Sequence, residues 1–258
     1  MLTEDFTEKL KTLDEKNIVY TVDFTKTFGS KNNEKIACSK INFLAEKGNV
    51  TVLLGENGAG KSTLLKSLCG TQYETSGKIS VLGETDFEKI RSITAFVPEI
   101  PVLDLNLTVK ETVYIEGMIH GLKGKALKEN ADFAFEKSEL KDVLNVKASA
   151  LSKGFRQRLS LAKALSFNPE VLILDEFSGG LDPAQIQKMR NTIKKLAEEK
   201  AVILSTHNLN ECENLSDKVY ILHKGQTASC GTTEEICSQF SVKTLQEAFF
   251  KITSETKD

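Results

Sequence analysis

Gly55-Glu56-Asn57-Gly58-Ala59-Gly60-Lys61-Ser62 is the stretch of this 258-residue chain that decides its fold. It fits the pattern G-x-x-x-x-G-K-[ST], in which glycines let the backbone curl until several N–H groups face one anion. A short apolar run, Asn49–Leu54, precedes the stretch, and residues with helical spacing, Ser62–Leu68, follow it. The stretch therefore predicts a phosphate-binding loop between a strand and a helix whose positive end adds to the attraction.

Nucleotide binding at this loop would give two side chains distinct roles. Lys61 would bridge the outer phosphates of ATP, and the Ser62 hydroxyl group would bind Mg²⁺. The candidate nucleotide-binding residues continue one position further, to Thr63. The sequence thus predicts a chain that binds ATP with Mg²⁺ and hydrolyses it.

Three polar residues follow other expected strands. Asp175 and Glu176 come directly after the apolar run Val171–Leu174, and His207 comes just after the run Ala201–Leu204. Because ligands gather outside the carboxyl ends of the strands in an open α/β sheet, these residues should lie near the loop. Asp175 can then orient Mg²⁺, Glu176 can accept a proton from the attacking water, and His207 can contact the γ-phosphate or that water. Without the loop, Glu176 would be read as a solvated or helix-capping acid and His207 as a satisfied core residue.

Helices alternate with short apolar strands after Leu151, which predicts a parallel α/β sheet. Ahead of the loop, Ile18–Phe28 and Ile36–Phe43 suggest an antiparallel sheet, joined by a turn at 29–33. The elements expected after Leu151 are helix Ser152–Phe167, strand Val171–Leu174, helix Pro183–Glu199, strand Ala201–Leu204, helix Leu209–Leu215, a hairpin of Val219–Leu222 with Gln226–Ala228, and helix Lys243–Lys251.

Helix-forming residues fill the segment from about Leu107 to Leu144, with Gly117, Gly121 and Gly124 as interruptions, so a helical insertion is expected there. The predicted fold class is α/β: a P-loop NTPase core with a parallel sheet, an N-terminal antiparallel β subdomain and an inserted α-helical subdomain. The expected boundaries are an extension of unknown role at 1–17, an ATPase domain at 18–253 with its helical subdomain at about 100–165, and a tail at 254–258.

Composition narrows the class of partner. With 34 basic and 36 acidic side chains the net charge is -2, so no nucleic-acid partner is expected. No run of about 18 apolar residues could span a bilayer, so any membrane part would belong to another subunit. The five cysteines are scattered without a Cys-x-x-Cys pair and are interpreted as buried or neutral thiols.

Leu151-Ser152-Lys153-Gly154-Phe155-Arg156-Gln157-Arg158 resembles the signature, usually written LSGGQ, of the ATP-binding subunits of ABC transporters. Ser152 should cap the following helix, while its hydroxyl group and the Gly154 N–H face outward as anion donors. The resemblance runs from about Ile18 to Thr253. It implies that these donors complete the ATP site of a facing subunit, so that two copies, or two different ATPase subunits, pair head to tail around two nucleotides.

Other motifs extend the resemblance. Phe28 resembles the aromatic residue that stacks on adenine, the alternative being a core aromatic at a strand end. The segment from Glu176 to Pro183 resembles the join between the catalytic glutamate and the D-loop, with Asp182 at the dimer seam, and Ser205-Thr206-His207 resembles the switch-histidine motif. The insertion resembles the arm that contacts an integral membrane permease, which implies a protein held at the cytoplasmic face of a membrane by that partner.

Three residues depart from the family pattern. Glu99 stands where the Q-loop glutamine is usual, near the nucleotide and Mg²⁺, so metal affinity and coupling to the partner are the properties it would change. Phe155 replaces the signature glutamine, and Phe177 replaces the usual proline after Glu176. Because Ser152, Gly154 and Glu176 are retained, turnover is still expected.

The leading hypothesis is therefore the motor subunit of a transporter. Leu107-Thr108-Val109-Lys110-Glu111, the Ser-Lys-Gly form of the signature, and Leu245-Gln246-Glu247-Ala248-Phe249-Phe250 look most like subunits of systems that export drugs, lipids, polysaccharides or ions. Two alternatives stay open: a soluble ATPase of the same family that serves another process, and a nucleotide-binding regulator with a degenerate site.

Overall fold

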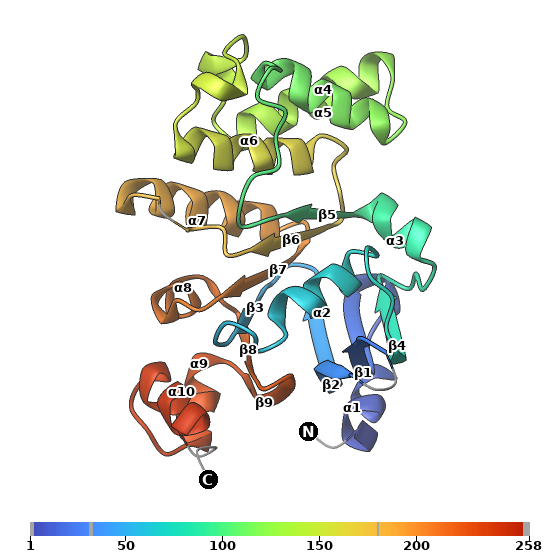
Figure 1. The fold of residues 1–258 in the computed structure, drawn as a ribbon, viewed down its shortest axis with the longest axis vertical. Helices are drawn as coiled ribbons and strands as arrows, with labels where there is room; N and C mark the ends of the chain where they lie inside the picture. The colour runs from blue at the N-terminus through green and yellow to red at the C-terminus, as the bar shows by residue number, and fades with distance from the viewer. Residues whose placement is uncertain (1–2, 31–32, 180, 255–258) are drawn as a thin grey trace.

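A computed structural model describes residues 3–30, 33–179 and 181–254, and within these ranges the strands form one six-stranded and one three-stranded sheet (Figure 1). The strands are β1 (Ile18–Phe28), β2 (Lys35–Glu46), β3 (Val50–Leu54), β4 (Ser76–Val81), β5 (Thr94–Val97), β6 (Val171–Asp175), β7 (Ala201–Thr206), β8 (Lys218–His223) and β9 (Gln226–Gly231). The α-helices are α1 (Thr3–Leu10), α2 (Lys61–Leu68), α3 (Phe87–Ile93), α4 (Val109–Ile119), α5 (Gly124–Lys137), α6 (Lys153–Leu165), α7 (Pro183–Ala197), α8 (Leu209–Leu215), α9 (Thr233–Gln239) and α10 (Leu245–Ser254).

The larger sheet has the order β5-β6-β7-β3-β8-β9, and it is parallel except for the β8–β9 hairpin. Strands β3 and β7 are buried along their whole length, as expected for strands covered on both faces. The predicted parallel sheet and closing hairpin are confirmed. Since β3 lies between β7 and β8, the loop that follows β3 emerges at the middle of the sheet.

The predicted antiparallel pairing of the first two strands is also confirmed, because β1 pairs with β2 along its length. In the expected turn at 29–33, Lys31 and Asn32 lie outside the described residues. Strand β4, which pairs with the other edge of β1, was not predicted from the sequence. Its second residue, Gly77, has φ +99° and lies against the backbone of Asp23, so glycine here fits a close approach of two strands rather than a loop.

Helices α4, α5 and α6 pack together beyond the β5 edge of the larger sheet (Figure 1). Two of the three predicted interruptions are wrong. Gly117 lies inside α4, where a side chain would meet Leu127 of α5 at 2.6 Å, so its small size permits the two helices to approach. Gly124 is the first residue of α5, and Gly121, with φ +83°, falls between the helices as expected.

Helix α1 lies in the segment 1–17, for which no secondary structure was predicted. Phe6 is buried and packs with Ile18 and Tyr20 of β1 and Leu44 of β2, so α1 covers part of the small sheet. The predicted domain boundaries remain predictions, and residues 255–258 of the expected tail lie outside the described part of the chain. None of the helices in the described ranges combines the length and the apolar character needed to cross a bilayer.

Candidate functional site: a nucleotide cleft at the centre of the sheet

The stretch 55–62 forms a tight loop between β3 and α2, as predicted. Two glycines explain its shape. Gly58 and Gly60 have φ +84° and +104°, which other residues adopt only with strain. A side chain at Gly60 would also meet the Ala37 carbonyl oxygen at 2.7 Å. The backbone N–H groups at the start of α2 lack partners within the helix, so they are available to an anion in the loop.

Lys61 is buried and folds back over its own loop. Its Nζ atom donates hydrogen bonds to the carbonyl oxygens of Gly55, at 2.8 Å, and Glu56, at 3.2 Å. The same ammonium group lies 3.5 Å from Oε1 of Glu176. A positive charge therefore lies inside the loop, next to a carboxylate from another strand.

Asp175 is the last residue of β6 and Glu176 follows it, and the two carboxylates differ in their partners. Glu176 Oε2 lies 2.7 Å from Nδ1 of His207, which is itself exposed beyond the end of β7. Asp175 accepts a hydrogen bond from the Ser205 hydroxyl group instead. Glu176 also has φ +46°, a left-handed conformation that costs free energy in a non-glycine residue and is found most often at functional sites. The three strand-end residues thus gather at one edge, as the sequence predicts.

A cleft of about 430 Å³ collects residues from five separate segments. The lining residues are Phe28, Lys35, Ile36, Ala37, Asn57, Gly58, Gly60, Lys61, Ser62, Thr63, Glu99, Asp175 and Glu176. Phe28 is 44% exposed, and Nζ of Lys26 lies 5.3 Å from its ring centroid, so it is an exposed ring at the cleft rather than a core aromatic. Lys35 and Ile36 were missed, because neither belongs to a motif and only the pairing of β1 with β2 brings them to this place.

The predicted signature residues lie elsewhere and do not line this cleft. Ser152 caps α6 as predicted, since its Oγ atom accepts a hydrogen bond from the Phe155 N–H at 3.4 Å. Gly154 is buried, however, so the expectation that it faces outward is wrong for this conformation. The reason is Gln185, whose Oε1 atom lies so close that a side chain on Gly154 would stand 1.5 Å from it.

Asp182 holds Gln185 in that position. Its carboxylate caps α7, accepting a hydrogen bond from the Gln185 N–H at 2.9 Å and another from the Gln185 side-chain amide. Asp182 itself is exposed. In the segment from Glu176 to Pro183, Gly180 lies outside the described residues.

The three departures from the family pattern occupy different environments. Glu99 is exposed and lines the cleft. Phe155 is half-buried, and its ring centroid lies 5.5 Å from the guanidinium carbon of Arg158. Phe177 is buried in the main core, so it anchors the chain directly after Glu176.

The predicted neutral thiols include one directly beneath the loop. Cys38 is buried, and its Sγ atom lies 3.5 Å from the Gly60 carbonyl oxygen. Burial raises the pKa of the Cys38 thiol to about 12, which the backbone hydrogen bond at Leu64 only partly opposes. This cysteine is therefore a neutral packing residue and adds no charge to the site.

Comparisons with known proteins agree with this geometry. The profile of the family described as ABC transporter matches residues 38–179, which is 142 of the 258 residues. The bacitracin transport ATP-binding protein BcrA of Bacillus licheniformis is 38% identical over 216 residues, covering 81% of this chain and 68% of that protein. The Nod factor export ATP-binding protein I of Rhizobium sp. (strain N33) is 32% identical over 218 residues, covering 83% and 70%.

A solved structure agrees with the fold as well. The ATP binding subunit of an ABC transporter superposes with a TM-score of 0.81 at 27% identity, and the match covers 91% of this chain and 99% of that one. The expected fold class, an α/β P-loop core with an antiparallel subdomain and inserted helices, is confirmed. With a phosphate loop, strand-end carboxylates and a signature helix in place, this chain belongs to the ABC transporter family as an ATP-binding and ATP-hydrolysing subunit.

Proposed function

We propose that this chain is the motor of an exporter and works as a head-to-tail dimer on a separate membrane subunit. The observation that carries the proposal is the cleft at which Phe28, the phosphate loop, Glu99, Asp175 and Glu176 meet. Hydrolysis of ATP depends on positioning and charge stabilisation, and the cleft offers a ring for the base, N–H groups and a lysine for the phosphates, and carboxylates for metal and water.

Lys61 and Glu176 change partners in the proposed cycle. Nζ of Lys61 lies 3.5 Å from Oε1 of Glu176. A bound γ-phosphate would attract the ammonium group and leave Oε1 of Glu176 free to accept a proton from the attacking water. His207 would keep its contact with Oε2 and so hold the carboxylate in the orientation needed for that transfer.

The donor set suits Mg²⁺ bound together with a nucleotide. Ser62, Asp175 and Glu99 offer one hydroxyl and two carboxylate groups in the same cleft. In the described ranges no three His, Cys, Asp or Glu residues gather closely enough to hold a metal by themselves. Mg²⁺ is ordinarily held by one or two carboxylates together with substrate phosphates and water, where it neutralises charge on the phosphates, so the residues fit this ion.

The dimer supplies the second half of the site in this proposal. Ser152 and Gly154 would meet the γ-phosphate bound to the facing subunit, either an identical or a different ATPase chain, and Asp182 would lie at the seam. For this to happen Gln185 must leave Gly154. Its Oε1 atom is buried and forms no hydrogen bond within the described residues, so moving it breaks no bond at that atom.

A second surface supports docking to a permease. A cleft of about 430 Å³ lies between α3, β5, α4 and α6, with Phe96, Val102 and Phe167 in its walls. Exposed apolar side chains continue beside it at Ile100 and Ile119, which are 75% and 71% exposed. An apolar surface of this kind favours a protein partner. The names of the two relatives, bacitracin transport and Nod factor export, support export as the direction of transport.

The test is co-purification combined with hydrolysis. The tagged chain, extracted from its own membranes in mild detergent, should bring down a multi-span membrane protein. The purified pair should release phosphate from ATP, and Lys61→Ala should abolish that release. Recovery without any membrane protein would favour the soluble ATPase alternative. Phosphate release that does not respond to Lys61→Ala, or none at all from the unaltered pair, would favour the regulator with a degenerate site.

A further inference from the structure

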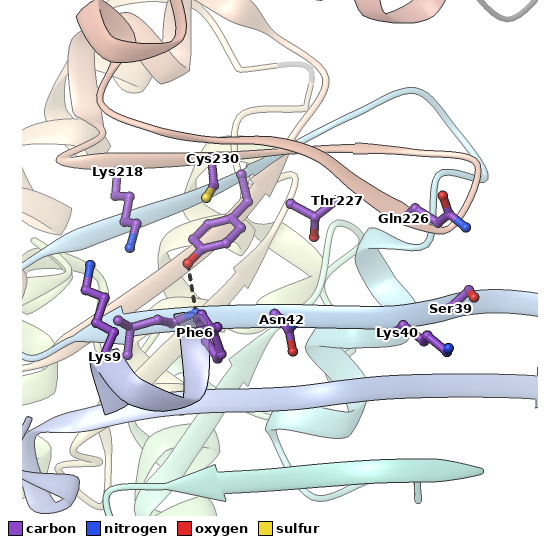
Figure 2. Close-up of a pocket in the computed structure, with 11 residues that line it drawn as sticks. Phe6, Lys9, Ser39, Lys40, Asn42, Lys218, Gln226, Thr227 and Cys230 are labelled. Atoms are coloured by element: carbon purple, nitrogen blue, oxygen red, sulfur yellow. Dashed lines mark hydrogen bonds between the residues drawn. The ribbon is translucent and has the colours of Figure 1, made fainter. Parts of the chain in front are cut away.

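A pocket of about 270 Å³ lies between α1, β2 and the β8–β9 hairpin (Figure 2). It shares no lining residue with the nucleotide cleft. Its volume is just below about 300 Å³, the lower end of the range for small-molecule sites. Nothing in the proposed transport cycle uses this pocket, so its residues call for a separate explanation.

Positive charge gathers in this pocket without an acidic partner. Lys9 of α1, Lys40 of β2 and Lys218 of β8 line it, and no acidic residue belongs to the lining. The side-chain ammonium groups of these three lysines form no ion pair or hydrogen bond within residues 3–30, 33–179 and 181–254. Figure 2 shows the side chains of Lys9 and Lys218 extending toward each other from opposite walls. Two like charges in this arrangement repel, and an anion between them would remove the repulsion.

Lys218 is half-buried, whereas Lys9 is exposed. The Nζ atom of Lys218 lies 5.2 Å from the ring centroid of Tyr220, whose hydroxyl group is occupied by a hydrogen bond from the Leu44 N–H. Burial lowers the pKa of Lys218, and the nearby charge of Lys9 lowers it further, while Glu46 and Glu235 act in the opposite direction. The ammonium group is thus held in a place where its own charge is disfavoured until a counter-charge arrives.

An unpartnered hydroxyl group lies on another wall. Thr227 of β9 lines the pocket, and its Oγ1 atom is buried with no hydrogen-bond partner in the described part of the chain. Figure 2 shows this hydroxyl directed toward the side of the pocket on which Asn42 lies. Buried polar atoms are nearly always paired, so an unpartnered hydroxyl group in the same pocket as these lysines points to a polar ligand rather than an apolar one.

We infer that this pocket binds a small phosphate monoester, with the phosphate group between Lys9 and Lys218 and the rest of the molecule along Tyr220 and Thr227. A phosphate monoester is chosen over a carboxylate because it carries close to two negative charges at neutral pH, which matches the two facing ammonium groups. An oxygen in the rest of the molecule can accept a hydrogen bond from the Thr227 hydroxyl group. The site is independent of the proposed transport function.

The test is NMR of the unaltered, backbone-labelled chain in saturating MgADP, which fills the phosphate loop. Glycerol 3-phosphate is added at constant ionic strength, with acetate as the comparison anion. Saturable amide shifts should appear at Lys218, Thr227 and Asn42, with acetate binding at least about tenfold more weakly. Lys9→Met, an exposed substitution that should fold, should weaken glycerol 3-phosphate binding about tenfold, while Lys128→Met on α5 should leave it unchanged.

The phosphate could equally come from a lipid headgroup, so a second arm uses vesicles that contain phosphatidic acid. Vesicle binding that Lys9→Met weakens, without a response to glycerol 3-phosphate, assigns the pocket to a headgroup. Absence of saturable shifts at the pocket together with absence of Lys9-dependent vesicle binding overturns the inference. An equal affinity of the parent chain and Lys9→Met for glycerol 3-phosphate overturns it as well. Because the amide shifts are measured on the unaltered chain, this part of the test does not depend on whether a variant folds.

Discussion

Nδ1 of His207 lies 2.7 Å from Oε2 of Glu176, so an exposed imidazole holds a carboxylate that is only 15% exposed. On its other side the carboxylate faces Lys61, and its backbone is fixed in a left-handed conformation. Glu176 is therefore oriented by contacts with other residues of the chain. This arrangement explains how one residue can be both a structural counter-charge to Lys61 and the proposed base.

Replacing the proposed base tests its chemical role. Glu176→Gln keeps the size of the side chain and its place beside His207 but cannot take up a proton. We expect ATP hydrolysis to fall by about 10² to 10⁴, the usual contribution of a general base, with ATP binding retained and a closed dimer accumulating. Steady-state phosphate release and light scattering with ATP measure the two effects. Glu129→Gln, on the exposed face of α5, serves as the control, and hydrolysis at the parent rate in Glu176→Gln would show that another group is the base.

Ser152 has two proposed roles that a matched variant separates. Removal of its cap on α6 by Ser152→Ala should cost about 1 kcal/mol of unfolding free energy. Thr232→Ala removes a comparable cap from α9 and should cost a similar amount. Only Ser152→Ala should also lower the hydrolysis rate at high protein concentration, where dimers form. Equal hydrolysis rates in the two variants would argue against a contact between Ser152 and the partner's nucleotide.

Glu99 adds a negative charge beside the proposed metal position. Glu99→Gln restores the neutral amide that is usual in the family, so the affinity for Mg²⁺ should fall by a factor of about 3 to 10, since one nearby charge in a solvated cleft is worth on the order of 1 kcal/mol. The Mg²⁺ concentration for half-maximal hydrolysis, measured at saturating ATP, reports the change. An unchanged Mg²⁺ dependence would place Glu99 outside the metal's surroundings.

Protonation of His120, which lines the proposed permease cleft, should make the free energy of unfolding depend on pH. Its ring stacks on Phe167 at 3.6 Å, and the charged groups around it are Glu116, Lys163 and Arg91. Burial lowers the pKa of His120 below its ordinary value, and Glu116 only partly opposes this. The folded state therefore binds fewer protons than the unfolded chain, so the free energy of unfolding falls as the pH drops below about 6.5.

Urea unfolding near neutral pH and about one to two units lower checks this prediction. His120→Phe keeps a ring on Phe167 but takes up no proton, so its unfolding free energy should fall less over the same interval. Identical losses in the parent chain and in His120→Phe would assign the acid sensitivity to other groups.

Much of the nucleotide cleft could be predicted from the sequence because its residues sit at positions with a fixed geometry. A glycine-rich loop after β3 and polar residues after β6 and β7 must meet when these strands are parallel neighbours. Ser152 was predicted as a cap for a similarly local reason. For the cleft, short-range patterns and one rule of sheet topology were sufficient. For the Ser152 cap, the short-range pattern alone was sufficient.

The features that were missed depend on contacts between segments that no local pattern connects. Gly154 is covered because Asp182 fixes Gln185, which is more than thirty positions further along the chain. Gly117 looks like a helix breaker until α5 is placed against it. The pocket between α1 and β9 needs the packing of Phe6 on β1 and β2, which the charged N-terminal sequence does not reveal.

The central place of β3 has a consequence for how the protein is made. The strand that ends in the phosphate loop has β7 and β8 as its neighbours, and both are synthesised about 150 residues later. The turn residue Gly225 also donates a hydrogen bond to the Ala59 carbonyl oxygen of the loop. ATP therefore cannot help β3 and its loop to fold before β7 and β8 have been synthesised. The nucleotide can act as a stabilising ligand only once the chain as far as Gly225 has left the ribosome.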